Sequence, residues 1–327
     1  MKSPFANCDA TFKCTKSKLM FRKESFDYIH LYYECDETKE GFTTDEIDDV
    51  NVMQIYNQYR VKYGIPFPDE IRAVRQKYGL SAAKMSQILG FGDNQYRLYE
   101  NGEMPSEANG KILMTIMNRT VFKSIVENSR HQFDKDEYVK IIGKINALDD
   151  EDDEKKVIKN IVFNSERGLY NGFAERSLNK LKNVLLFFIN KCGGVFKTKI
   201  NKLLFYTDFY AYKNYGFAIT GLSYKAIKFG PVPNNWNRVY SMFDEIEEIP
   251  VDFGGDVEGS KLVSEMQPDF SVFKDNEIKV LEYVYSQLGD ATSAKISEIS
   301  HQEDAWKDNV GTAGLIDFSY AFSLKAI

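Results

Sequence analysis

The chain has 327 residues, of which 43% are hydrophobic and 14% aromatic, and its formal net charge is −6. This length suits two or three domains with sizeable cores. The net charge is negative and does not indicate a nucleic-acid-binding protein, so any contact with DNA must come from a local basic patch. Four cysteines are too few and too unevenly spaced for a disulfide framework, and the longest apolar run, Val184 to Ile189, is far shorter than the roughly 20 residues of a membrane-spanning helix. The N-terminal segment is polar and lacks the apolar core of a signal peptide, so we expect a soluble cytoplasmic protein.

Residues 1–48 predict a small β-rich unit. Short β-prone runs, among them 28–33, are separated by a turn-forming segment at 36–41. The layout resembles the YgiT-type zinc ribbon at the N-terminus of MqsA-like antitoxins, in which two Cys-x-x-Cys pairs build a tetrahedral site.

The ribbon-like segment departs from this zinc-binding pattern. Cys8 and Cys14 are separated by five residues instead of two. A Cys-x-x-Cys pair that began at Cys35 would have its second cysteine at position 38, where the chain has Thr38. Three thiols and His30 could complete a site, but structural zinc normally needs four well-spaced ligands. The sequence therefore predicts a degenerate ribbon without a cofactor, with zinc at Cys8, Cys14 and Cys35 as the less favoured alternative.

Residues 49–130 predict an all-helical domain that is reached through a linker helix. Thr44 can cap this linker helix, which continues with amphipathic spacing to about Tyr63. Short helices are expected at 69–78, 80–89 and 93–102, and Gly90-Phe91-Gly92 joins the second to the third. Two short helices joined by such a turn are typical of a helix-turn-helix.

The segment IRAVRQKYGLSAAKMSQILGFGDNQYRLYENGEMPS resembles the helix-turn-helix of Xre/Cro-type repressors. The resemblance implies that the third helix enters the major groove of operator DNA, usually in a homodimer. The candidate DNA-binding residues are Asn94, Gln95 and Arg97 for base contacts and Lys84, Arg72 and Arg75 for phosphate contacts. Residues 69–103 hold five basic and five acidic residues, so a helical domain that binds protein is the alternative.

Residues 131–170 predict a helical, acidic connector. The preceding domain ends with a helix expected at 111–130, and the connector is expected to hold helices at 134–148 and 157–164, all from their apolar spacing. The run from Asp149 to Glu154 is entirely acidic, which is typical of solvated surface because like charges repel. The glycine-containing segment 165–173 is the expected boundary before the C-terminal domain.

The stretch from Lys199 to Trp236 has the strongest pattern in the C-terminal half. Aromatic and apolar residues recur at helical spacing, and Gly216 can end this helix in a left-handed conformation. We expect a strand at 223–229, a turn at 230–233 because two prolines fix φ, and a helix that starts at Trp236 and is capped by Asn234 or Asn235. Further helices are expected at 177–191, 276–288 and 293–300, and a polar hairpin at 251–267.

Three separated elements within residues 171–327, KLLFY, YKAIKFGPVP and ISHQEDAW, resemble the SocA-like domain, which is also called the Panacea domain. The resemblance implies an antitoxin that neutralises a protein toxin, or a protease adaptor. The overall fold class is therefore α+β and multidomain: a ribbon-like unit, an all-α helix-turn-helix domain and a mainly helical α+β domain.

Aromatic residues on the 199–215 helix are the candidate contacts with a toxin. Tyr and Phe provide large contact area at low entropic cost, so the predicted toxin-binding residues are Tyr206, Phe209, Tyr210, Pro231 and Trp236. The three helical aromatics occupy adjacent rows, so at least one is expected near the surface. The alternative is that all three lie in the core and the toxin binds elsewhere.

The sequence contains no glycine-rich phosphate loop, nucleophile elbow or metalloprotease histidine pair. His30, His131 and His301 are scattered, and although His301 could pair with Glu303 or Asp304 as a general base, a structural histidine at a helix end is favoured. We therefore expect a non-enzyme, the antitoxin of a type II toxin–antitoxin pair, which binds its toxin through the C-terminal domain and represses its operon through the helix-turn-helix. A protease adaptor and a stand-alone transcriptional regulator are the alternatives.

Overall fold

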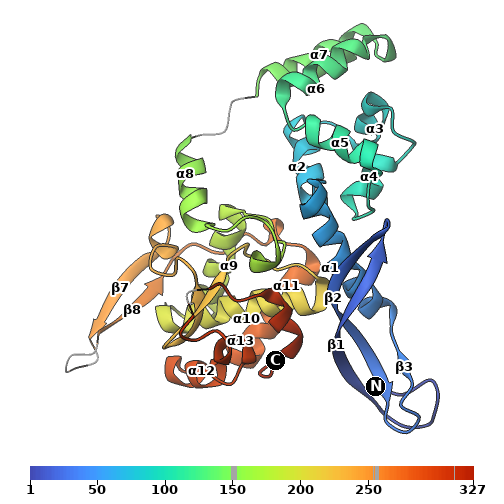
Figure 1. The fold of residues 1–327 in the computed structure, drawn as a ribbon. Helices are drawn as coiled ribbons and strands as arrows, with labels where there is room; N and C mark the ends of the chain where they lie inside the picture. Colours follow the sequence, from blue (N-terminus) through green and yellow to red (C-terminus); the bar gives the residue numbers. More distant parts are fainter. Residues whose placement is uncertain (149–152, 253, 255–257, 313) are drawn as a thin grey trace. The chain divides into compact units, whose positions relative to one another are not determined.

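The computed structural model describes residues 1–148, 153–252, 254, 258–312 and 314–327 (Figure 1). The chain forms two compact units, one made of Met1–Ile55 with Asp153–Ile327 and the other of Tyr56–Asp152. The mixed α+β class agrees with the sequence. Within the described ranges, none of the helices has the length and apolar composition needed to cross a bilayer. Of the acidic run, 149–152 lies outside the described residues.

The N-terminal segment forms the predicted β-rich structure. Its antiparallel sheet has the order β1-β2-β3, with β1 at Ala10–Phe21, β2 at Glu24–Cys35 and β3 at Gly41–Phe42. Arg22 and Lys23 make the β1–β2 turn with φ of 47° and 70°. Two-residue hairpin turns with positive φ at both positions match the right-handed twist of the strands that they join. Asn51 of α1 (Asp45–Tyr63) accepts from Leu31 N and donates to Leu31 O, both at 2.9 Å. This side chain therefore ties α1 to β2.

The unit Tyr56–Asp152 is helical. Its helices are α2 (Pro68–Lys77), α3 (Ala82–Leu89), α4 (Gln95–Glu100), α5 (Glu107–Thr115), α6 (Arg119–Asn128) and α7 (Lys135–Asn146), with a 3-10 turn at Arg130–Gln132. One apolar core contains Met85, Tyr96, Phe122 and Ile145. Because Ile145 belongs to α7, the helical unit continues beyond the expected boundary at residue 130.

The single helix expected at 111–130 is wrong, because α5 and α6 are separate. The first ends at Thr115, and Asn118 caps the second, where its side-chain oxygen accepts from Thr120 N at 2.9 Å and from Val121 N at 3.2 Å. An asparagine in the middle of an apolar helical pattern favours such a break because it competes for backbone donors.

The rest of the chain after residue 152 combines helices with two small sheets. Its α-helices are α8 (Asp153–Val162), α9 (Leu178–Lys191), α10 (Lys197–Tyr215), α11 (Asp275–Leu288), α12 (Ser293–Ser300) and α13 (Asp304–Lys307). Its strands are β4 (Val195–Phe196), β5 (Tyr224–Ile227), β6 (Gly230–Pro233), β7 (Glu247–Asp252) and β8 (Glu258–Val263), and 3-10 turns lie at Leu169–Asn171, Tyr240–Met242, Phe270–Val272 and Phe318–Ser323. The sheets have the orders β4-β8-β7 and β5-β6. The expected polar hairpin is therefore confirmed as β7–β8.

Helix α10 is the centre of this region (Figure 1). It contacts α9, α11, α12, β6 and the 3-10 turn at Phe318–Ser323. Every residue from Ile200 to Phe209 is buried, so neighbours surround the helix on all sides. Gly216 ends it with φ of 70°, as the sequence predicts.

The turn expected at Gly230–Pro233 is wrong, because these residues form strand β6. The turn lies at Lys228-Phe229, and the register pairs Ile227 with Gly230 and Ala226 with Pro231. In a two-residue hairpin the pairs alternate between hydrogen-bonded and non-hydrogen-bonded, which places both prolines of β6 at non-hydrogen-bonded positions. Their missing N–H groups therefore cost the ladder nothing.

The helix expected to start at Trp236 is also wrong. Residues 234–238 form turns, and the next helical segment is the short 3-10 turn at Tyr240–Met242. Asn235 Nδ2 donates to Ile161 O, so this asparagine fastens the turn to α8 instead of capping a helix.

Candidate functional site

Three segments that are distant in the sequence meet around Gly230. Lys202 belongs to α10, Gly230 opens β6, and Ser300 ends α12. A Cβ placed on Gly230 would lie 2.6 Å from Ser300 Oγ, 2.8 Å from Lys202 Cε and 3.2 Å from Lys202 Nζ. Gly230 also has φ of 104°, where side chains are strained, so both its conformation and its surroundings require glycine.

Lys202 carries a buried ammonium group. Its exposed fraction is 1%, and within the described ranges no hydrogen bond or ion pair joins its Nζ to another residue. Burial alone lowers the pKa of Lys202 to about 8, because the charged form loses its hydration. Such a group is unfavourable unless something compensates its charge.

His301 follows Ser300 directly at the end of α12. Its ring stacks on Trp306, with centroids 4.1 Å apart and planes 21° from parallel. Trp306 Nε1 donates to Ile227 O at 2.8 Å, which fixes the ring pair against β5. His301 Nε2 is buried without a hydrogen-bond partner among the described residues. Burial, followed by the positive charge of Lys202, lowers the pKa of His301.

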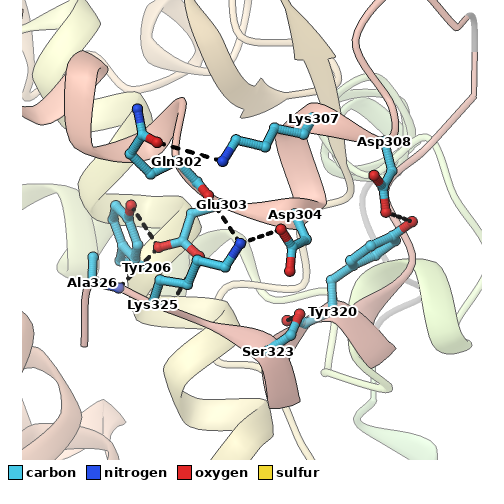
Figure 2. Close-up of polar contacts among 10 residues, drawn as sticks. All are labelled: Tyr206, Gln302, Glu303, Asp304, Lys307, Asp308, Tyr320, Ser323, Lys325 and Ala326. Carbon is cyan, nitrogen blue, oxygen red and sulfur yellow. Dashed lines mark hydrogen bonds and ion pairs between the residues drawn. The ribbon is translucent and has the colours of Figure 1, made fainter.

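Glu303 and Asp304 do not pair with His301, because other residues hold their carboxylates. Glu303 is 1% exposed and turns to the C-terminal segment, as Figure 2 shows. Its carboxylate accepts from Tyr206 Oη at 3.1 Å, from Lys325 N at 2.9 Å and from Ala326 N at 3.1 Å. Lys325 Nζ in turn pairs with Asp304. These carboxylates therefore anchor residues 325 and 326.

A second buried carboxylate, Asp208 of α10, holds the segment that leads into β5. It accepts from Ile219 N at 2.9 Å, Thr220 N at 2.8 Å, Tyr224 Oη at 2.6 Å and Thr220 Oγ1. Burial raises the pKa of Asp208, and the hydrogen bonds oppose this rise because they favour the charged form. The carboxylate fixes the strand that forms one wall beside Gly230.

The predicted toxin-binding residues fall into two groups. Tyr206 and Phe209 are fully buried and Pro231 is buried in β6, so none of the three presents a surface to a partner. The interpretation of Tyr206 and Phe209 as surface anchors fails because α10 is enclosed. Tyr210 is half-buried and stacks on Tyr283 at 4.5 Å, which agrees with the expectation that one helical aromatic lies near the surface. Trp236 is half-buried in the turn after β6.

Among the predicted base-contacting residues, Asn94 and Arg97 are exposed. Asn94 has φ of 62° and immediately precedes α4, and Arg97 lies within α4. Gln95 is half-buried, and its Nε2 donates to Glu103 Oε1 at 3.1 Å. Ser81 caps α3 as expected by accepting from Lys84 N at 3.1 Å.

The predicted phosphate contacts are engaged within the helical unit. Arg75 Nε lies 2.5 Å from the carboxylate of Glu100, which is 6% exposed, and Arg72 Nη2 donates to Glu100 O at 3.2 Å. Lys84 Nζ pairs with Glu137 at 2.6 Å. Arg72 and Arg75 therefore both bind Glu100 at the end of α4. The sequence did not reveal this contact because Glu100 lies 25 residues from Arg75.

The three candidate thiol ligands do not converge. Cys8 Sγ lies 3.3 Å from Cys35 Sγ, whereas Cys14 is exposed and its Sγ lies 3.9 Å from Phe322 O. Hydrogen bonds from Ser3 and Thr38 lower the pKa of Cys35 to about 6. Among the described residues, no group of three or more His, Cys, Asp or Glu side chains is arranged to hold a metal ion.

The residues around Gly230 were missed as a site, although a signal for them was present. Each of the three elements that resemble the Panacea domain contributes one member: Lys202 from KLLFY, Gly230 from the GPVP element, and His301 from ISHQEDAW. Motifs that are separated in the chain but converge in space indicate a shared site.

Comparison with known families supports the resemblance of the C-terminal half. The sequence model of the family described as "Antitoxin SocA-like, Panacea domain" matches residues 200–307. This range contains α10 from Ile200 onward, the β5–β6 hairpin, α11, α12 and α13. No curated protein matches the chain. No solved structure matches it either.

Proposed function

We propose that the chain is the antitoxin of a type II toxin–antitoxin pair and not an enzyme. The observation that carries this proposal is the match of residues 200–307 to the SocA-like antitoxin family. The matched range contains the site around Gly230, so the partner toxin binds this part of the chain. Its buried carboxylates, Asp208 and Glu303, are occupied by structural hydrogen bonds, and the proposed role needs only binding, not chemistry.

In the same proposal, the helical unit binds operator DNA as a homodimer and represses the operon. Two features support this role: the short helices α3 and α4 joined through Gly90, which has φ of 67°, and the exposed Asn94 and Arg97 at α4. The arginine can donate two hydrogen bonds to guanine, and the asparagine can pair with adenine. Arg75 and Arg72 have the separate task of holding α4 in position through Glu100.

The test is co-expression in a growth assay. The neighbouring gene is expressed alone and together with the full chain, and we expect it to arrest growth in the first case and growth to recover in the second. An electrophoretic mobility shift with the upstream intergenic DNA tests repression, and binding is expected to weaken steeply with salt because phosphate contacts release counterions. A chain that neither restores growth nor retards the DNA is not an antitoxin of this type.

A further inference from the structure

The ammonium group of Lys202 differs from the other buried charges of the C-terminal region described above. Asp208 and Glu303 are each surrounded by hydrogen-bond donors, and Lys180 pairs with Glu277 at 2.9 Å. Lys202 is 1% exposed, and no carboxylate in the described part of the chain pairs with it. A buried unpaired charge costs several kcal/mol, so its presence needs a reason other than stability.

A second polar group without a described partner belongs to His301, which follows Ser300 in the chain. His301 Nε2 is buried without a described partner, and His301 is close enough to Lys202 to respond to its charge. The position that a Cβ of Gly230 would take is 2.6 Å from Ser300 Oγ and 3.2 Å from Lys202 Nζ. The Lys202 ammonium and the Ser300 hydroxyl therefore both pack closely against Gly230, and His301 follows Ser300 directly.

We propose that Lys202 and His301 donate to a carboxylate, which an acidic residue of the protein partner inserts beside the β5–β6 turn. A carboxylate has two oxygens for the two donors, the ammonium and the imidazole Nε2–H, and its charge balances that of Lys202. A phosphate has further oxygens that would need further donors. The carboxylate fits the few donors present.

The surroundings of the site give this carboxylate a route. His301 and Trp306 are half-buried, so their stacked rings connect the buried lysine with the surface. Phe229, in the turn directly before Gly230, is 63% exposed and offers an apolar contact for the residue that carries the carboxylate. A charged anchor beside an exposed aromatic side chain is typical of the centre of a protein interface.

The identity of the partner rests on the proposed function, but the carboxylate chemistry does not. A free carboxylate such as acetate presents the same group, so it serves as the probe for the site itself. In sodium acetate, compared with sodium chloride at equal ionic strength, we expect the full chain to melt at a higher temperature and the amine of Lys202, followed by NMR, to titrate at a higher pH. Lys202→Met should abolish the acetate response, and Lys295→Met, on the exposed face of α12, should keep it.

Lys202→Met is expected to fold, because it replaces an unpaired buried charge with an apolar side chain of similar length. Its melting temperature in chloride should therefore equal or exceed that of the wild type. His301→Phe, which keeps a ring to stack on Trp306 but removes the Nε2 donor, provides an independent variant.

With the co-encoded toxin, Lys202→Met and His301→Phe should weaken binding at least about tenfold, whereas Lys295→Met should bind as the wild type does, and acetate should compete. If the toxin binds all variants equally and acetate has no effect on melting or titration, the inference is overturned. If acetate stabilises the chain but neither variant affects toxin binding, the site takes a free carboxylate and the assignment to the partner is wrong. A toxin that the wild type does not bind defeats the proposed function alone, and the acetate experiment then still decides the site.

Discussion

Replacing Asp208 should strongly destabilise the region around α10. The side chain is fully buried, and its Oδ1 accepts from Ile219 N and Thr220 N while its Oδ2 accepts from Thr220 Oγ1 and Tyr224 Oη. Asp208→Ala leaves four donors without an acceptor. Each unsatisfied buried donor costs about 1–3 kcal/mol, and the loss of the buried charge offsets part of the sum, so we expect a net loss of about 3–5 kcal/mol.

Asp208→Asn separates hydrogen bonding from charge. Its carbonyl oxygen can still accept from the two backbone N–H groups, and its amide can donate to the two hydroxyls if they rotate. We therefore expect the asparagine variant to lose about 1–2 kcal/mol, clearly less than the alanine variant. The exposed Asp244→Ala serves as the control and should change stability by less than about 0.5 kcal/mol.

Urea denaturation followed by tryptophan fluorescence measures these changes. The chain has two tryptophans, Trp236 and Trp306, and both lie in the unit that contains α10, so the signal reports this unit and not the helical one. The midpoints and slopes give the free energy of unfolding by linear extrapolation. If Asp208→Ala and Asp244→Ala both lose less than about 1 kcal/mol, the carboxylate does not hold β5 in place and the reasoning is refuted.

The remaining predictions concern other parts of the chain. Arg97→Ala should weaken operator binding by about 1–3 kcal/mol without lowering stability, whereas Arg75→Ala should lower the melting temperature of the helical unit; equal effects of both variants in a gel shift and a melting assay would contradict this division. The stability contribution of Lys202 should rise from about pH 8 to 10.5, because the unfolded chain still binds the proton that the folded chain has released; this rise, up to about 3 kcal/mol in urea denaturation, should be missing in Lys202→Met. Treatment with diamide should link Cys8 to Cys35 and leave Cys14 free for alkylation, and a cross-link that contains Cys14 in peptide mapping would show that the N-terminal segment is arranged differently.

Local patterns predicted several helices and their ends, although they missed the break between α5 and α6 and predicted a helix at Trp236 that is not there. The spacing of apolar residues in α10, the left-handed Gly216 and the Ser81 cap of α3 depend on neighbours within a few residues, and the structure has all three. The β5–β6 hairpin shows where such patterns fail. Two prolines indicate a turn when read locally, but strand pairing places them at positions where no N–H is needed.

The candidate site could not be derived from local patterns because its members come from distant segments. The neighbours of Tyr206 in the sequence do not show whether its side chain lies in the core or at the surface. It is buried because other elements enclose α10 on all sides. Arg75 has the composition of a phosphate contact, but its partner Glu100 is brought to it by the fold. The lack of a partner for Lys202 is likewise a property of the packed structure alone.

The account depends most on the claim that the full chain neutralises a protein toxin through the region around Gly230. The direct measurement is growth of cells that express the toxin from the neighbouring gene together with the wild type, Lys202→Met or Lys295→Met, with the level of each chain checked by immunoblot. We expect full growth with the wild type and Lys295→Met and little or no growth with Lys202→Met at equal protein levels. Toxin-expressing cells that stay arrested with the wild type, or that grow equally well with all three chains, would contradict the account.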